Sequence, residues 1–146
     1  MPLTSEIGEG LQVLSRTQCL ALLPTVPIGR VVVTIGALPA AFPVSFALVD
    51  AAILFVTGEG TKLSAALKHA VVAFEVDDFD PAARRGWSVL VQGISCVVDD
   101  ERDPRWTLAQ DIDVWGNRDA SHVAAVSLEH VSGRLLGPWP ADGPPS

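Results

Sequence analysis

The residues best suited to chemistry lie in the stretch Thr57-Gly-Glu-Gly-Thr-Lys62. A hydroxyl ends a predicted strand, a glycine-rich loop follows, and Lys62 stands in the first turn of a predicted helix that Thr61 can cap. Free backbone N–H groups at a helix start, the partial positive charge there and an ammonium group all favour a phosphate. The stretch therefore predicts an anion site. The alternative is a capped surface helix with a solvated lysine.

The histidines and cysteines do not extend this site. His69, His122 and His130 stand beside no serine or cysteine nucleophile motif and have no metal-ligand spacing. Cys19 and Cys96 are too few and too isolated for a disulfide framework or a metal site, so we expect both to be small buried apolar residues. The sequence therefore assigns no catalytic residue and no metal ligand.

Size and charge narrow the class of protein. The chain has 146 residues, of which 49% are apolar and 18% charged, and we expect one domain over residues 1–146. A net charge of -7 argues against general nucleic-acid binding, and no apolar run reaches the ~18 residues of a membrane span. Residues 1–10 lack the basic patch and apolar stretch of a secretory signal, so we expect a cytoplasmic protein.

Short segments rich in β-branched residues must position the anion site. We expect strands at 28–35, 41–49, 53–57, 71–76, 87–98, 122–128 and 131–136, and short helices at 16–23, 62–69 and 105–110. The stretch Asp77–Gly86 is expected to be a loop, Gly93 to mark a bend or bulge, and residues 1–13 and 138–146 to be flexible or extended termini. Many short strands with hairpin-scale connections describe an antiparallel barrel or sandwich.

Four segments carry a more specific signal: Pro43-Val-Ser-Phe46, Thr57-Gly-Glu-Gly-Thr-Lys-Leu63, Ala73-Phe-Glu-Val-Asp77 and Gly86-Trp-Ser-Val-Leu-Val-Gln-Gly93. In this order and spacing the sequence resembles the pyridoxamine 5'-phosphate oxidase family of flavin-binding split β-barrels, particularly its small actinobacterial-type members. The resemblance extends from about Leu14 to Val98. It implies a mainly β fold, namely an antiparallel split barrel of six or seven strands with two or three short helices. It also implies a homodimer with flavin sites at the interface.

The resemblance also assigns roles to individual residues. The backbone of Val44, Ser45 and Phe46 would lie along the flavin ring. Thr57, Thr61 and Lys62, with the adjoining Leu63, would hold the phosphate of FMN. Trp87 and Ser88 would meet the ring or the ribityl chain, although a large aromatic such as Trp87 more often plugs a barrel end or an interface. The family often has Asn at the position of Ser45, so one polar contact to the ring is shortened or lost.

The function implied by the resemblance is an FMN-dependent oxidoreductase that acts on a small molecule, with NADH or NADPH as a candidate electron donor. A flavin-storing or flavin-sensing module is one alternative. The other is a member of the same fold that binds haem or the deazaflavin F420, whose longer acidic tail calls for more basic residues. Pyridoxamine-phosphate oxidase activity itself is not expected, because the C-terminal part has only Arg134 and no Arg-x-His motif.

The resemblance extends to contacts from a partner subunit. In the expected homodimer, Trp139 is a candidate to contact the flavin of the partner. Arg84 and Arg85, which are adjacent to each other in the sequence, are expected to be solvated on a loop rather than to hold the phosphate.

Overall fold

The computed structural model describes residues 11–58, 61–115 and 122–140. Its strands are β1 (Leu11–Leu14), β2 (Ile28–Ile35), β3 (Leu38–Val49), β4 (Ala52–Thr57), β5 (Val71–Asp80), β6 (Arg85–Val98), β7 (His122–Ser127) and β8 (His130–Leu136). Its helices are α1 (Arg16–Leu22), α2 (Lys62–Ala66) and α3 (Pro104–Gln110), with a 3-10 turn, η2 (Leu23–Thr25), after α1. Within these described ranges, no helix has the length and apolar character to cross a membrane.

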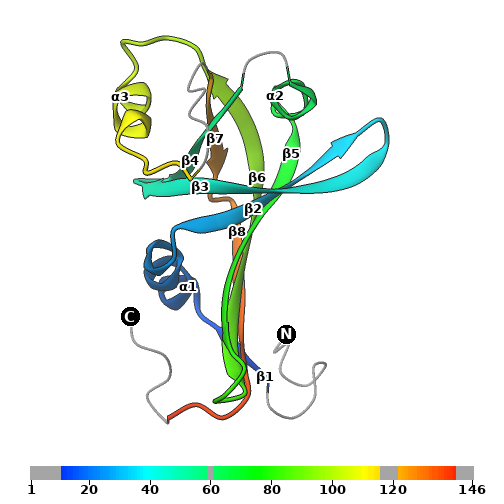
Figure 1. The fold of residues 1–146 in the computed structure, drawn as a ribbon, viewed down its shortest axis with the longest axis vertical. Helices are drawn as coiled ribbons and strands as arrows, with labels where there is room; N and C mark the ends of the chain where they lie inside the picture. Colours follow the sequence, from blue (N-terminus) through cyan, green and yellow to red (C-terminus); the bar gives the residue numbers. More distant parts are fainter. Residues whose placement is uncertain (1–10, 59–60, 116–121, 141–146) are drawn as a thin grey trace.

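Six strands close a barrel. Strands β6, β5, β2, β3, β4 and β7 pair in this order, and β7 also pairs with β6 (Figure 1). Strand β6 is shared, because its first half pairs with β8 over Gly86–Gln92 and its last residues pair with β7 over Ser95–Val98. Strand β1 then pairs with β8. The predicted antiparallel split barrel with short helices is confirmed, and β8 and β1 extend it beyond the closed part.

Gly93 lies where β6 passes from one partner strand to the other. A Cβ atom there would stand 1.9 Å from the carbonyl oxygen of Ser127, so only glycine allows this close approach. The adjacent Ile94 N–H donates to the Ser127 hydroxyl at 2.9 Å. The change in neighbours of β6 therefore depends on this glycine.

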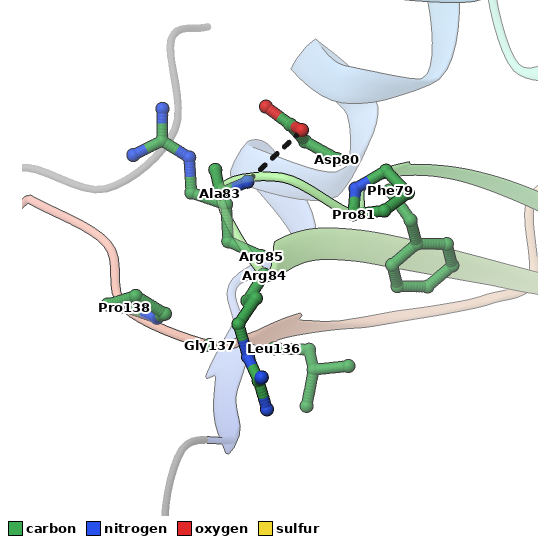
Figure 2. Close-up of a pocket in the computed structure, with 9 residues that line it drawn as sticks. All are labelled: Phe79, Asp80, Pro81, Ala83, Arg84, Arg85, Leu136, Gly137 and Pro138. Carbon is green, nitrogen blue, oxygen red and sulfur yellow. Dashed lines mark hydrogen bonds between the residues drawn. The ribbon is translucent and has the colours of Figure 1, made fainter.

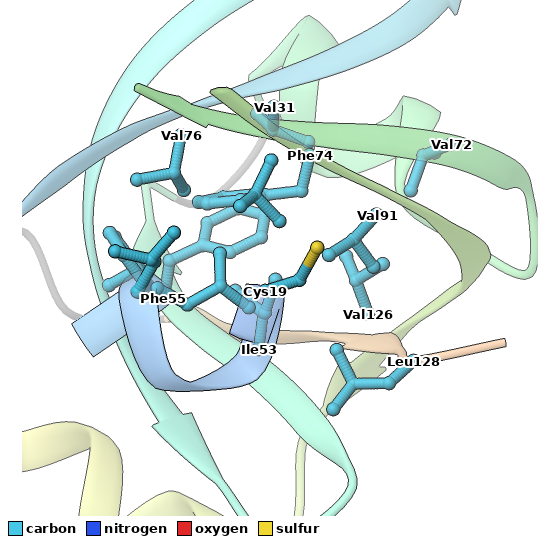
Figure 3. Packing of buried hydrophobic residues seen from close by; sticks show 14 of the residues in the cluster. Cys19, Val31, Ile53, Phe55, Val72, Phe74, Val76, Val91, Val126 and Leu128 are labelled. Atoms are coloured by element: carbon cyan, nitrogen blue, oxygen red, sulfur yellow. The ribbon is translucent and has the colours of Figure 1, made fainter. Parts of the chain in front are cut away.

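The core consists of two apolar clusters. The larger one draws residues from α1 and from strands β1 to β8, and in it the Phe74 ring contacts that of Phe55 (Figure 3). The Phe74 ring also contacts that of Phe46. The smaller cluster packs residues of α3 against β4, β6 and β7. Along β3 the even-numbered side chains belong to the larger cluster and the odd-numbered Ala47 and Val49 to the smaller one, as the two-residue period of a strand requires.

The predicted loop at Asp77–Gly86 is wrong. Strand β5 continues to Asp80 and β6 begins at Arg85, so only four residues form the turn. The Asp80 carboxylate accepts the backbone N–H groups of Ala82 and Ala83 and so holds the turn. Pairing of this part of β6 with β8 stabilises an extended conformation that the polar local sequence does not favour.

Two other predicted boundaries also move. Strand β3 begins at Leu38 rather than Ala41 and includes Pro39 and Pro43, which lie where β3 pairs with β2 alone and one side of the strand has no partner. Helix α2 ends at Ala66, and His69 has a left-handed φ of 49°. By contrast, the Ser15 capping box predicted for α1 is present.

Candidate functional site

A cavity of about 340 Å³ opens beside the strand that the resemblance places along a flavin ring. It is lined by Ile28, Pro43, Val44, Ser45, Val56, Val114 and Trp115. These residues come from β2, β3, β4 and the segment that follows α3. The lining is mostly apolar, and the volume is near the lower end for ligand pockets, about 300–1,000 Å³. The cavity suits a flat ring system rather than a complete nucleotide.

The three predicted residues of β3 do not all face this cavity. Phe46 is a core residue whose ring lies 5.1 Å from that of Phe74. Ser45 is buried, and its hydroxyl oxygen accepts the backbone N–H of Trp115 at 3.3 Å. Val44 is half-buried and lines the cavity with Ser45. The Ser45 hydroxyl therefore holds the segment carrying Trp115 over the cavity.

The predicted anion loop begins next to the cavity. Val56 lines the cavity, and the following residue, Thr57, is the buried end of β4. Thr61 caps α2, because its hydroxyl accepts the Ser64 N–H at 3.0 Å and donates to the Gly58 carbonyl at 3.2 Å. The Thr61 hydroxyl is thus already engaged in the cap.

Lys62 is the exposed cation of this loop and forms no ion pair with any residue that the structure describes. Leu63 is half-buried and packs against the larger apolar cluster. Glu59 and Gly60, the middle of the predicted loop, lie outside the described residues. Among the predicted phosphate contacts, Lys62 is therefore the side chain available to an anion.

Trp87 and Ser88 lie elsewhere, in the half of β6 that pairs with β8. Trp87 is buried in the larger cluster, which agrees with the alternative that it plugs the fold. Ser88 is half-buried beside Asp77 and Arg134 in the register of the sheet. Neither residue lines the cavity.

A charged cluster of Arg30, Glu75 and Asp77 links β2 and β5. The Arg30 Nη1 atom lies 3.4 Å from a carboxylate oxygen of each acid. Loss of solvation, a hydrogen bond with Asp77 and the negative charge of Asp77 together raise the pKa of Glu75 to about 7, against the opposing effect of Arg30. Glu75 therefore titrates near neutral pH in the folded protein.

The family model described as "Pyridoxamine 5'-phosphate oxidase" matches residues 15–135 of this barrel. The chain belongs to the pyridoxamine 5'-phosphate oxidase family. Its similarity to individual members of the family is also substantial. It is 38% identical over 126 residues to the "Uncharacterized protein Rv0080" of Mycobacterium tuberculosis, and the match covers 82% of each chain.

Two solved structures resemble this member of the family. The FAD binding protein from Mycobacterium smegmatis is 34% identical, with a TM-score of 0.72 over 86% of this chain and 97% of that one. An FAD-binding protein from Mesorhizobium loti is 26% identical, with a TM-score of 0.67 over 87% of this chain and 99% of that one. Both likenesses extend beyond the segments recognised in the sequence and into the C-terminal third.

Trp139, the candidate for contact with a partner's flavin, packs against its own chain. The indole N–H of Trp139 donates to the backbone carbonyls of Gly86 and Leu136, and the Arg85 guanidinium lies 4.8 Å from the centre of its ring. Trp139 is thus held by its own chain, because the residues after β8 fold back against β6.

Sequence reasoning missed several residues of the cavity, namely Trp115, Ile28, Val56 and Val114. The Trp115 side chain is 65% exposed although it is large and aromatic. A tryptophan in the mixed segment after α3 was the available signal, but its contact with Ser45 spans 70 residues of sequence. In the described part of the chain, no group of three or more His, Cys, Asp or Glu residues could hold a metal ion.

Proposed function

We propose that this chain binds a flavin nucleotide, FMN in the first place, and acts as an oxidoreductase on a small molecule. The observation that carries the proposal is the continuity between cavity and loop. Val56 lines the cavity, and the chain then continues through Thr57 to the exposed Lys62. A ring bound in the cavity would thus have its phosphate-bearing chain directed toward a cation.

The side chains of the cavity have distinct parts in this proposal. Ile28, Val44 and Val56 offer apolar surface to one ring system. The backbone of β3 beside them offers N–H and C=O groups to its polar edge, because residues 38–45 of β3 pair only with β2. Trp115, held by Ser45, covers the ring and excludes water. A bound flavin would supply reversible redox chemistry, while the protein orients it.

The proposal also specifies which flavin nucleotide is bound. A single lysine beside a helix start suits the one terminal phosphate of FMN. The two FAD-binding relatives favour the longer dinucleotide instead. Purified protein stripped of ligand and titrated with FMN, FAD and F420 distinguishes the three through the change in absorbance. We expect FMN to bind most tightly, and a protein that binds none of them would contradict the proposal.

The same sample separates an enzyme from a storage or sensing module. If the flavin is catalytic, NADH or NADPH should bleach its visible absorbance and an electron acceptor should restore it. The two nicotinamides are tested in parallel without oxygen. Flavin that binds but is not bleached by either donor would favour the module.

We also propose a homodimer. Val71 of β5 and Ile94 of β6 are paired in register, and their side chains are 80% and 47% exposed. Isolated exposed apolar residues are common, but two on adjacent strands form a patch that a second copy can cover. This patch is at the end of the hairpin that adjoins α2.

A further inference from the structure

A second cavity, of about 630 Å³, lies at the turn between β5 and β6 (Figure 2). It is formed by the turn itself and by the residues that follow β8. The turn is at the opposite end of the molecule from α2 (Figure 1). Strand β5 runs from Val71 to Asp80, and at about 3.3 Å per residue its length is roughly 30 Å. No residue that lines this cavity also lines the cavity proposed for the flavin ring, so the two are distinct.

The cavity is cationic in an acidic protein. Arg84 and Arg85 line it, against one carboxylate, that of Asp80. The Asp80 carboxylate accepts two backbone N–H groups of the turn, which offset part of its charge. Arg85 is engaged with the ring of Trp139. Arg84 is exposed and its side chain forms no ion pair with any residue that the structure describes, so it is the cation available to a ligand.

An apolar platform adjoins this cation. Phe79 and Leu136 flank Gly86 in the register of the sheet and are 49% and 46% exposed. A Cβ atom on Gly86 would stand 2.0 Å from the Phe79 ring, so the ring lies directly over the glycine backbone. Figure 2 shows the Phe79 ring and the Leu136 side chain beside the turn. Together they form an exposed apolar surface, and covering it with an apolar ligand is favourable.

Contacts between the turn and the residues that follow β8 hold the cavity in shape. Gly137 has a φ of 85° and packs so closely on the turn that a Cβ atom would stand 2.1 Å from the Arg84 carbonyl oxygen. Arg84 itself has a left-handed φ of 55°. The Trp139 indole N–H then ties the segment after β8 to Gly86. A site fixed in this way loses little freedom when it binds a ligand.

We infer that this cavity binds a small organic anion with a flat apolar body, such as an aromatic carboxylate, sulfonate or phosphate ester. The ring of the ligand would lie on Phe79 and Leu136, and its anionic group would meet the Arg84 guanidinium. Both halves are needed, because a simple inorganic anion leaves the platform exposed and a neutral arene leaves the cation unpaired. The inference stands on this cavity alone and does not depend on flavin binding.

The probe for the test is 8-anilinonaphthalene-1-sulfonate, an aromatic sulfonate whose fluorescence rises in an apolar site. We expect saturable binding of one molecule per chain by the full protein. Arg84→Gln and Phe79→Ala should each weaken the affinity by about tenfold or more, since each removes one half of the site. Both residues are exposed, so thermal unfolding should show that the variants remain folded.

Two controls make the test decisive. Arg102→Gln removes an exposed arginine elsewhere on the surface and should leave the affinity unchanged. The uncharged probe N-phenyl-1-naphthylamine should bind more weakly and should not respond to Arg84→Gln. The inference is overturned if the wild-type protein shows no saturable binding, as when a second copy covers the cavity. Equal losses in Arg102→Gln, or of the uncharged probe in Arg84→Gln, would overturn it as well.

Discussion

Lys62 is exposed at the start of α2, where its ammonium group has freedom to meet an anion. The neighbouring Thr61 hydroxyl is engaged in the cap of the same helix. Binding of a phosphate at this loop would thus depend mainly on Lys62, whereas the sequence suggests that Thr57 and Thr61 share the contact. Single-residue variants are informative for that reason, because no second described side chain of the loop can replace the charge.

Lys62→Ala should weaken FMN binding by roughly ten- to a hundredfold, since it removes a charge-assisted contact with the phosphate. The fold should survive, because Lys62 packs against nothing in the core. Titration followed by flavin fluorescence measures the change. Riboflavin, which has no phosphate, is the control and should bind equally to both proteins. Equal losses for the two ligands would remove Lys62 from the site.

Trp115 gives a second prediction at this scale. If its indole covers the flavin ring, Trp115→Leu should weaken binding by about two- to tenfold and make bound flavin more fluorescent, because a stacked indole quenches it. Trp115→Phe should keep most of the affinity, since a phenyl ring still stacks. Unchanged flavin emission in Trp115→Leu would show that the ring does not lie beneath this side chain.

At the scale of elements, the pair β2 and β5 carries the charged cluster of Arg30, Glu75 and Asp77. Neighbouring strands bring these side chains together, and the sheet removes part of their water. Two carboxyl groups then compete for one guanidinium, so the proton on Glu75 is retained to higher pH than in a free glutamate. The free energy of unfolding therefore depends on pH through Glu75, at the pairing of β2 with β5.

The sign of this dependence is fixed by the direction of the shift. The pKa of Glu75 is about 7 in the folded protein and near 4.5 when unfolded, so between these values only the folded state holds the proton. The contribution of Glu75 to stability is full below about pH 4.5 and is lost as the pH rises to about 7. Glu75→Gln should flatten this decline. Melting temperatures from pH 4.5 to 8 measure it, and parallel curves for both proteins would contradict it.

The sequence predicts the elements better than their extent. Alternating β-branched residues and the capping box are local signals, so β2 to β8 and α1 can be predicted, whereas β1 lies mostly in residues expected to be a flexible or extended terminus. The extension of β5 to Asp80 depends on pairing with β6, which in turn pairs with β8, far along the chain, so no pattern within residues 77–86 predicts it. The lining of the cavity is also hard to predict from the sequence. Its strand is recognisable from Pro43–Phe46, but Trp115 reaches it through a contact 70 residues away.

At the scale of the whole molecule, the property to test is the proposed dimer. Light scattering should give twice the mass of one chain across micromolar concentrations. Val71→Lys with Ile94→Lys should shift the protein to the monomer, because two buried charges without partners oppose association. Leu108→Lys, at an exposed position of α3, is the matched control and should remain dimeric. A wild-type monomer throughout this range would sink the proposal.

The shared strand β6 has a consequence for how the protein is made. One side of β6 pairs with β5, which is synthesised before it, while the other side waits for β7 and β8. On the ribosome, the nascent chain therefore carries an open strand edge from Gly86 to Val98 until nearly all described elements have emerged. Such an edge is a template for pairing with other chains. Folding of this barrel is thus completed only after β7 and β8 have emerged, and the interval before then is when the barrel is most exposed to aggregation.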